Sequence, residues 1–380
     1  MDPVLAWAQR KQSDVIALLR ELVECESPSD DPRAVARLVE LLASRLSKMG
    51  KIRVLPGSDG HGPHLQCDFD LPGAAHDGRI LALGHSDTVY PAGTLSSMPY
   101  QERDGRLWGP GIFDMKGGIA MFVFAMQALR DLDIPVRRRV LLQLNSDEEV
   151  GSPTSRQLTE DEARKSVAVL VLEPSAGMDG KAKTGRKGVG GYTVRVKGRS
   201  SHAGLDFASG ASAILELARQ IDRIAAFTDL DRGLTVNPGV IAGGTRTNVV
   251  ASDAWCEFDF RIARSADAAG LDEKFRTLKP VDPRCEISVE GGLNRPPLER
   301  SEGVAALYML AKEVAAGIGV ELGETSVGGG SDGNFTAGLG IPTLDGIGAV
   351  GDGAHAITES ILIDRIADRT ALLARLVERI

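Results

Sequence analysis

Apolar residues recur at three- and four-residue spacing through residues 13–50, with a break at Ser27-Pro28. This spacing is typical of amphipathic helices, so we expect two helices in this part of the chain. Residues 115–132 are apolar with small side chains, which predicts a helix that is buried on all sides. These segments predict helical layers that cover a hydrophobic core.

Short continuous apolar runs alternate with the predicted helices. They are RILAL at residues 79–83, VLLQL at 140–144 and VAVLVL at 167–172. Apolar strands of this kind, separated by helices, are typical of a mostly parallel sheet that is covered on both faces. The sequence therefore predicts an α/β domain.

The pattern changes after Lys187. Residues 192–200, YTVRVKGRS, alternate apolar and polar side chains as a half-exposed antiparallel strand does. The elements that follow are a helix near 211–226, strands that begin at 234, 254 and 285, and a helix near 268–278. We therefore expect a small α+β domain at residues 187–298, inserted into a larger domain formed by residues 1–186 and 299–380.

Composition and charge narrow the class of function. The chain has 380 residues, of which 43% are hydrophobic and 25% charged, and its formal net charge is -8. Nucleic acid is not an expected partner, because phosphate binding needs clustered Lys and Arg. The four cysteines form no C-x-x-C pair, which argues against a disulfide scaffold and against a thiolate zinc site.

No membrane partner is expected either. No stretch approaches the roughly 20 apolar residues that span a bilayer. The first fifteen residues, MDPVLAWAQRKQSDV, have no apolar segment behind positive charge. We therefore expect no signal peptide and a cytoplasmic location.

Three predicted strands end in side chains that bind metals. His85 and Asp87 follow the first strand, Glu148-Glu149 end the second and Glu173 ends the third. In open α/β sheets, ligands bind beyond the carboxyl ends of the strands. If these strands are neighbours, their terminal side chains converge on one crevice.

Two further candidates lie in glycine-rich segments. Asp114 lies in GPGIFDMKGG at the head of the buried helix, and His355 lies in GAVGDGAHAITES before the last helix. A buried cluster of Asp114, Glu149 and Glu173 with two histidines needs cations, because an unpaired buried charge is very costly. Nitrogen and oxygen ligands without thiolate suit Zn²⁺. Two Zn²⁺ bring +4 against −3 from the three carboxylates, and a bridging hydroxide would neutralise the remaining charge.

Other polar residues have simpler interpretations. His61, His64 and His76 lie in a stretch rich in Gly, Pro and Asp, where solvated loops are expected. Asp332 in GGGSDG is expected to stabilise its own loop as an Asx residue. No G-x-S-x-G segment occurs, which argues against a serine hydrolase.

Eight short segments occur in a single order between residues 84 and 335, within a resemblance that covers about residues 14–375. They are GHSDTV, GPGIFDMKGG, NSDEEVGS, LEPS, GRSSHAG, GGTRTNVV, DFR and GGGSDGNF. In this order the chain resembles the co-catalytic dizinc aminoacylase/carboxypeptidase family of peptidase clan MH, and especially its glutamate carboxypeptidase branch. The resemblance implies a zinc-peptidase-like αβα sandwich as the catalytic domain. It also implies a ferredoxin-like inserted domain that serves as a lid and dimerisation surface, and hence a homodimer.

The resemblance implies ligands for two Zn²⁺ ions, for which Co²⁺ or Mn²⁺ can substitute. One ion would be held by His85, Asp114 and Glu173. The other would be held by Asp114, Glu149 and His355, with Asp114 bridging the two ions. The peptide bond after the bridging aspartate would be cis.

The resemblance also implies the remaining catalytic residues. Glu148 would be the general base, taking the proton of a metal-bound water and delivering it to the leaving amine. Asp87 would accept the second ring N–H of His85. His202 in SSHAG would donate to the carbonyl oxygen, which in dimeric relatives it reaches from the partner subunit. Glu148 and the next residue would point to opposite sides, as neighbours on an extended chain do.

The substrate stays open between two interpretations. By the resemblance, Asn248, Arg295 and Lys181 would hold substrate carboxylates. Arg246 and the stretch GRKGVGG add cations that the branch lacks. The first interpretation is a carboxypeptidase that releases C-terminal glutamate from peptidyl, folyl or N-acyl substrates. The alternative is an N-acyl-amino-acid deacylase of the acetylornithine or succinyl-diaminopimelate type, or a dipeptidase. A non-catalytic binding protein would need a broken ligand set, and no ligand of the set is missing.

Overall fold

The computed structural model describes residues 2–73 and 78–380, so His76 lies outside the described residues. The chain divides into two compact units. The first comprises the residues up to Gly185 together with Arg300–Val327 and Ser331–Ile380, and the second comprises Arg186–Glu299 with Gly328–Gly330. The lid and dimerisation roles expected for the second unit stay predictions.

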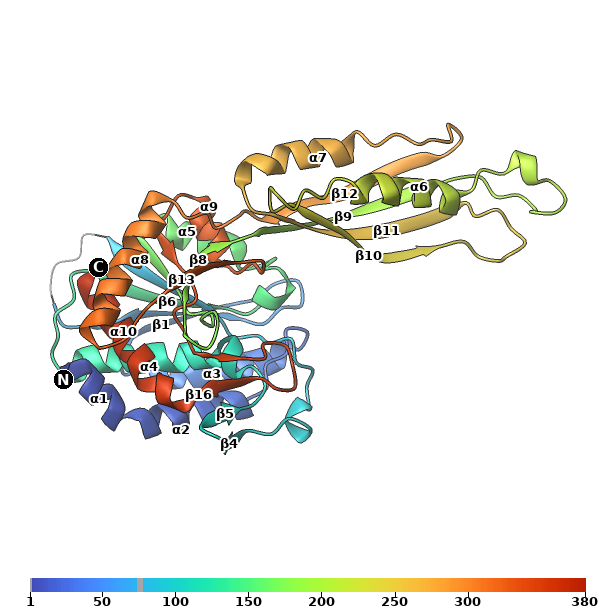
Figure 1. Ribbon diagram of the computed structural model, residues 1–380. Helices are drawn as coiled ribbons and strands as arrows, with labels where there is room; N and C mark the ends of the chain where they lie inside the picture. The colour runs from blue at the N-terminus through green and yellow to red at the C-terminus, as the bar shows by residue number, and fades with distance from the viewer. Residues whose placement is uncertain (1, 74–77) are drawn as a thin grey trace. The chain divides into compact units, whose positions relative to one another are not determined.

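A six-stranded sheet forms the middle layer of the first unit (Figure 1). Its strands, in order, are β1 (Gly50–Leu55), β2 (His64–Phe69), β6 (Arg139–Asn145), β3 (Arg79–His85), β7 (Ala168–Val171) and β14 (Thr343–Leu344). The last four are mutually parallel, whereas β1 and β2 form an antiparallel edge. The register pairs His85 with Asn145, so the carboxyl ends of β3 and β6 lie level.

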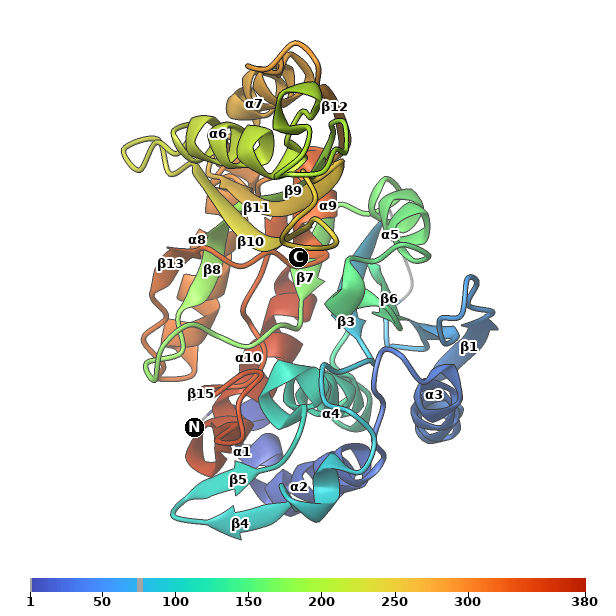
Figure 2. The same cartoon turned by 90° about the vertical axis from the view of Figure 1, so that its right-hand side faces the viewer.

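Side chains of the central strands alternate between two apolar layers. Leu81 and Leu83 pack in the layer that includes Ala163 of α5, whereas Ile80 and Ala82 pack in the layer formed with the helices of the other face. Figure 2 shows α3 and α4 on one side of β3 and β6, and α5 on the other. Because both faces are covered, apolar side chains fill most inner positions of these strands on both sides of the sheet. The predicted αβα sandwich is confirmed.

The α-helices of the first unit include the three predicted within residues 13–50 and 115–132, close to their expected positions. In chain order, the α-helices of this unit are α1 (Pro3–Arg10), α2 (Gln12–Glu24), α3 (Pro32–Leu46), α4 (Gly117–Asp131), α5 (Arg156–Ala163), α8 (Glu302–Gly317), α9 (Gly333–Gly338) and α10 (Ile366–Arg379). The break at Ser27-Pro28 separates α2 from α3 as expected. Helix α1 was not expected, although its start carries a signal: Asp2 accepts the N–H groups of Val4 and Leu5, and proline follows it.

The stretch Ile112–Asp131 corrects one expectation about membranes. By length and composition alone it could cross a bilayer, so the statement that no stretch approaches that length was wrong. Its most apolar window is 89% buried inside the protein. The burial identifies it as the core helix of the first unit.

The second unit contains an antiparallel sheet with two helices. Its elements are β9 (Gly188–Lys197), α6 (Ala213–Ala225), β10 (Thr235–Gly243), β11 (Asp253–Ile262), α7 (Ala268–Arg276) and β12 (Glu286–Arg295). The strand order β10-β11-β9-β12 and the βαββαβ sequence of elements are those of a ferredoxin-like fold. Tyr192 and Phe275 stack in its core with ring centroids 3.9 Å apart. The predicted fold of this segment is confirmed, and β10 lies at the edge of the sheet.

The side chain of Arg369 links α10 to two loops of the first unit by hydrogen bonds. This side chain is fully buried and donates to the carbonyl oxygens of Gly180, Gly346 and Gly348 at 3.1, 2.9 and 2.8 Å. A buried carbonyl that loses its donor retains the cost of desolvation. One guanidinium group therefore holds together segments that are far apart in the sequence.

We expect Arg369→Met to lower the free energy of unfolding of the first unit by about 3 kcal/mol or more, since each orphaned carbonyl costs about 1–3 kcal/mol. Urea unfolding followed by circular dichroism measures the change. Arg379→Met is the matched control, because Arg379 lies on the same helix in a half-exposed ion pair with Glu313. The control should change stability by no more than about 0.5 kcal/mol. Equal losses in both variants would contradict the role given to Arg369.

Candidate metal centre

His85 ends β3 and is buried at the carboxyl edge of the central sheet. Its Nε2 atom lies 3.1 Å from Oδ1 of Asp114 and 3.5 Å from Oε1 of Glu173. On the other side of the ring, Nδ1 lies 2.9 Å from the carbonyl oxygen of Asp87. A neutral ring that donates from Nδ1 to a carbonyl has a lone pair on Nε2, which is the form that binds a metal.

Asp114 lies in the turn Ile112–Lys116 that leads into α4. Its Oδ1 atom faces His85 at 3.1 Å, and its Oδ2 atom faces Nε2 of His355 at 3.4 Å. The Asp114–Met115 peptide bond is cis, as expected. One carboxylate therefore presents its two oxygens to two different imidazoles.

His355 lies at the tip of a hairpin between β15 (Gly351–Asp352) and β16 (Ser360–Leu362). Its φ angle of 62° is in the left-handed region, which is rare for a residue other than glycine. Its Nε2 atom lies 3.3 Å from Oε2 of Glu149, and half of the side chain is exposed. Strand β16 pairs with β5 (Arg106–Trp108), the strand that precedes the Asp114 turn.

The pair Glu148-Glu149 differs from the prediction in its local structure. Strand β6 ends at Asn145, and Glu148–Val150 form a 3-10 turn rather than an extended strand. The carboxylate of Asp87 accepts the N–H groups of Glu148 and Glu149, each at 3.2 Å. These hydrogen bonds to a side chain take the place of the backbone hydrogen bonds that an extended strand would make to its neighbour. Successive residues of a 3-10 turn point about 120° apart, so the two carboxylates still point in different directions.

The structure brings all six of these predicted side chains together. The ligand atoms of His85, Glu148 and Glu173 lie within 4.8 Å of one another, and so do those of His85, Asp114 and Glu149. His355 joins the second group through Asp114 and Glu149. Glu148 thus lies in the same group as Glu173, a proximity that the sequence did not indicate.

The donor set fits bound cations. Oxygen Oε1 of Glu149 is buried with no hydrogen-bond partner in the described residues. Burial raises the pKa of Glu149, and the carboxylates of Asp114 and Glu149 raise the pKa of His355 to about 10. Although burial opposes it, the carboxylate of Asp114 also helps to hold the pKa of His85 well above its usual value. Both histidines thus compensate negative charge that a divalent cation would neutralise.

Asp87 contacts His85 in a different way from the one predicted. The ring Nδ1 is closest to the backbone carbonyl oxygen of Asp87, at 2.9 Å, whereas the nearest carboxyl oxygen is 3.5 Å away. The carboxylate accepts a hydrogen bond from Oγ of Ser29 at 2.7 Å and from the backbone of the Glu148 turn. Asp87 therefore orients both the histidine ring and the turn.

Two polar residues beneath the Glu148 turn correct the simpler interpretations. Asp332, expected to stabilise its own loop, accepts hydrogen bonds from outside that loop: from Nδ2 of Asn145 at 2.6 Å and from Oγ of Ser152. His64 is buried in β2 rather than solvated, and its Nδ1 accepts the N–H of Ser146 at 3.2 Å. Both contacts join residues that are remote in the sequence, so local pattern carried no signal for them.

His202 and Asn248 lie together in the second unit. His202 pairs with Val249 in an antiparallel bridge, and the N–H of Ala203 donates to the carbonyl oxygen of Asn248 at 2.9 Å. Nδ1 of His202 accepts the N–H groups of Gly204 and Leu205, each at 3.1 Å. A neutral ring held in this way carries its proton on Nε2.

Of the other two predicted substrate residues, Arg295 belongs to the second unit and Lys181 to the first. Arg295 ends β12 and is buried, with Nη1 3.3 Å from Oδ1 of Asn294. Lys181 belongs to the first unit, where its ammonium group pairs with Asp179 at 3.0 Å in a largely solvated ion pair. Their roles toward substrate stay predictions.

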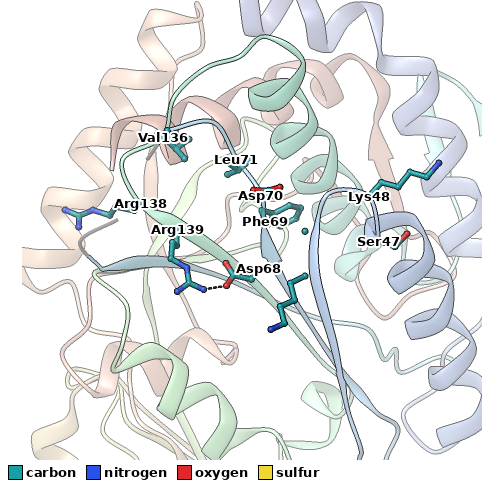
Figure 3. A pocket seen from close by; sticks show the side chains of 12 residues that line it. Ser47, Lys48, Asp68, Phe69, Asp70, Leu71, Val136, Arg138 and Arg139 are labelled. Atoms are coloured by element: carbon teal, nitrogen blue, oxygen red, sulfur yellow. Dashed lines mark hydrogen bonds and ion pairs between the residues drawn. The ribbon is translucent and has the colours of Figure 1, made fainter. Parts of the chain in front are cut away.

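A separate cavity of about 610 Å³ lies at the other end of the same strands (Figure 3). Its lining includes Lys48, Lys51, Asp68 and Arg139, and the last two form an ion pair. Strands β3 and β6 are parallel and seven residues long, so this end lies roughly 20 Å from His85. The cavity is therefore not part of the candidate metal centre.

A cluster of carboxylates and imidazoles at the carboxyl edge of an αβα sandwich is the arrangement of a metal-dependent hydrolase. Residues 81–379 match the model of a family described as Peptidase family M20/M25/M40. The chain belongs to this family, which confirms the family resemblance inferred from the eight segments.

Two relatives and one solved structure illustrate the similarity. Carboxypeptidase G2 from Pseudomonas sp. (strain RS-16) is 29% identical over 379 residues, covering 97% of this chain and 90% of that protein. Succinyl-diaminopimelate desuccinylase from Bordetella petrii is 29% identical over 368 residues, covering 92% and 93%. The crystal structure of aminopeptidase PepT from Bacillus cereus ATCC 10987 has a TM-score of 0.77 at 24% identity, covering 97% of this chain and 98% of that one. The last likeness concerns the fold alone.

We expect Zn²⁺ to raise the Tm of the metal-free protein, because cations relieve the repulsion among the converging carboxylates. At a free Zn²⁺ concentration 100 times Kd, the stabilisation is about 2.7 kcal/mol for one site. Asp114→Asn should lose most of the rise, since Asp114 faces both histidines. Differential scanning calorimetry measures the shift, and Asp179→Asn, which removes an exposed acid, should retain it. A rise of the same size in Asp114→Asn would exclude a metal centre at this cluster.

Proposed function

We propose that the protein is a dinuclear zinc hydrolase that cleaves an amide bond next to a free carboxylate. In this proposal it is a carboxypeptidase that releases C-terminal glutamate from peptidyl, folyl or N-acyl substrates. The observation that carries the proposal is the position of Asp114 between His85 at 3.1 Å and His355 at 3.4 Å, one for each carboxyl oxygen. Each of these histidines also faces a second carboxylate, Glu173 or Glu149, so the donors suffice for two cations.

The ligand sets follow from these pairs. His85, Asp114 and Glu173 would hold one ion, and Asp114, Glu149 and His355 would hold the other. When bound, the two ions polarise the substrate carbonyl and lower the pKa of water. Co²⁺ or Mn²⁺ has compatible ligand preferences and can take the same positions.

Glu148 is the residue in the cluster that this assignment leaves without a ligand role. Its carboxylate lies within reach of His85 and Glu173, beside the position where the attacking water must lie. One carboxyl oxygen of Glu148 takes a proton from that water as the new C–O bond forms. The same oxygen then delivers the proton to the amine nitrogen as the C–N bond breaks.

His202 is the proposed donor to the carbonyl oxygen, on which negative charge grows during the attack. Two backbone N–H groups occupy its Nδ1 atom, so the proton of a neutral ring is on Nε2 and is available to an acceptor. Donors of this kind stabilise the transition state because they are already oriented when the charge develops. Asp87 acts indirectly, by fixing the ring of His85 and the turn of Glu148.

The substrate carboxylate needs cationic or amide partners, for which we propose Arg295, Asn248 and Lys181. Carboxypeptidase G2 among the relatives supports the carboxypeptidase assignment. The desuccinylase, at the same identity, supports the second candidate, a deacylase of small N-acyl amino acids. Both reactions cleave an amide beside a free carboxylate and differ in the group that is released. The cytoplasmic location and the absence of nucleic-acid and membrane partners stay predictions.

We expect the zinc-loaded protein to release glutamate from peptidyl and folyl substrates with a higher kcat/KM than it shows on N-succinyl or N-acetyl amino acids. Product identification by mass spectrometry across such a panel makes the comparison. A preference for acyl substrates would favour the deacylase. No hydrolysis of any member by protein with two zinc ions would refute the proposed reaction.

Glu148→Gln should lower kcat by about 10²–10⁴-fold, because an amide cannot take the proton of water. The zinc content should stay at two per chain, since Glu148 is not assigned as a ligand. Glu40→Gln, an exposed acid on α3, should leave both quantities unchanged. Loss of one zinc ion in Glu148→Gln would show instead that Glu148 is a ligand.

A homodimer through the second unit is also part of the proposal. Strand β10 is an edge strand, and its Val240 and Ile241 are 50% and 62% exposed. Ile214 and Leu215 of α6 are exposed as well. An edge strand with exposed apolar side chains is a template for pairing with another chain.

Ile241→Glu should convert the dimer to monomers, because it places a charge on the apolar edge. Sedimentation velocity at micromolar concentration distinguishes the two states. Val281→Glu is the control, since Val281 is similarly exposed at 56% but lies outside the edge strand. A monomeric wild-type protein would refute the proposed dimer, and a dimeric Ile241→Glu variant would exclude this edge as its interface.

A further inference from the structure

Glu359 is a buried carboxylate that no part of the proposed reaction uses. It accepts hydrogen bonds from three backbone N–H groups and from one tyrosine hydroxyl. A carboxylate saturated by four donors is a rigid link between the segments that supply them.

The three backbone donors belong to the turn that carries Asp114. Oε2 of Glu359 accepts the N–H of Gly111 at 3.2 Å, and Oε1 accepts those of Phe113 and Asp114 at 2.7 and 3.0 Å. Gly111 has a φ angle of 72°, so the turn departs from helical geometry at its start. Buried N–H groups are nearly always satisfied, usually by secondary structure. Here a side chain about 245 residues further along the chain satisfies them.

Glu359 belongs to the hairpin that carries His355. It directly precedes β16, which pairs with β5 beside the Asp114 turn. The hydroxyl of Tyr90 donates to Oε2 of Glu359 and also lies 3.0 Å from the carbonyl oxygen of Ala356. The same carboxylate is therefore anchored at the Asp114 turn and at the base of the His355 loop.

We propose that Glu359 is a positioning residue that sets the separation of Asp114 and His355, and thereby the affinity of the ion held by Asp114, Glu149 and His355. This inference rests on the proposed two-ion function. Both positions share Asp114, but the other one also has His85 at the end of β3 and Glu173 just after β7, paired central strands of the sheet, and therefore depends less on Glu359. The two sites therefore differ in what fixes their ligands.

A glutamine cannot replace Glu359 in this arrangement. The carboxylate offers acceptor lone pairs on both oxygens, and donors occupy both of them. A carboxamide has one acceptor oxygen and an NH₂ group that only donates. In Glu359→Gln the NH₂ group therefore faces a backbone N–H group on one side, although the size of the side chain is unchanged.

Stepwise metal binding tests the proposal. Metal-free wild-type protein and Glu359→Gln are titrated with Zn²⁺ against a competing chelator. Co²⁺ absorption spectra then report the coordination of each equivalent. We expect the first equivalent to change little and the second to bind about 10–100-fold more weakly in the variant, the usual effect of losing an outer-shell partner. Tyr90→Phe removes one donor of four and should weaken the second equivalent by less.

Glu162→Gln is the matched control for the loss of a buried carboxylate. Glu162 is buried and pairs with Arg79, the first residue of β3, at the opposite end from His85. This variant should leave both metal affinities unchanged even where it lowers Tm. Glu359→Gln, by contrast, should weaken the binding of the second ion.

Three results would overturn the proposal. Equal affinities in wild type and Glu359→Gln would exclude the positioning role, and so would an equal weakening of both ions, which indicates general loosening. If Glu359→Gln does not fold, unchanged binding of the second ion in Tyr90→Phe would exclude it. A wild-type protein that binds fewer than two ions would overturn the proposed function itself, a failure that the wild-type titration alone reveals.

Discussion

The structure of the candidate centre depends on one carboxylate that must face two imidazoles at once. Oδ1 of Asp114 faces His85 and Oδ2 faces His355, so neither histidine can shift without changing the environment of the other. The three residues come from a strand end, a turn and a hairpin tip. Every segment that positions one of them is therefore constrained by the other two. This shared constraint explains why two residues outside the ligand set, Asp87 and Glu359, accept hydrogen bonds from the segments that carry the ligands.

The fold satisfies this constraint in two ways, one for the ligands on the central sheet and another for the ligands in irregular segments. His85 and Glu173 follow parallel strands that are covered on both faces by apolar layers, and packing at crystal-like density fixes them. Asp114 and His355 lie in irregular segments, where hydrogen bonds from Glu359 and the pairing of β16 with β5 replace sheet packing. Hydrogen bonds of this kind fix the positions of these segments without apolar contacts.

The sequence pattern predicted the ligands on the central sheet better than the ligands in irregular segments. Apolar runs with acids and histidines at their ends located His85 and Glu173, because strand period and strand termination are local properties. Asp114 and His355 were candidates from their glycine-rich segments, and only the family resemblance assigned them to particular ions. The 3-10 turn at Glu148 was missed because the carboxylate of Asp87, about 60 residues earlier, determines it. Asp332 and Glu359 were missed for the same reason: their partners are remote in the sequence, and such contacts leave no periodic signal.

The charges around the centre also bear on where a substrate carboxylate can bind. The three proposed ligand carboxylates and Glu148 carry −4, and Asp87 and Glu359 add two further negative charges whose hydrogen bonds come from uncharged donors. Under the proposed function two dications would bring +4, whereas the side chains around them favour cations and repel anions. A carboxylate-bearing substrate therefore needs separate polar or cationic groups for its free carboxylate. Under the proposed function, that need assigns the chemistry to the cluster and carboxylate recognition to residues such as Arg295 and Asn248, which belong to the second unit.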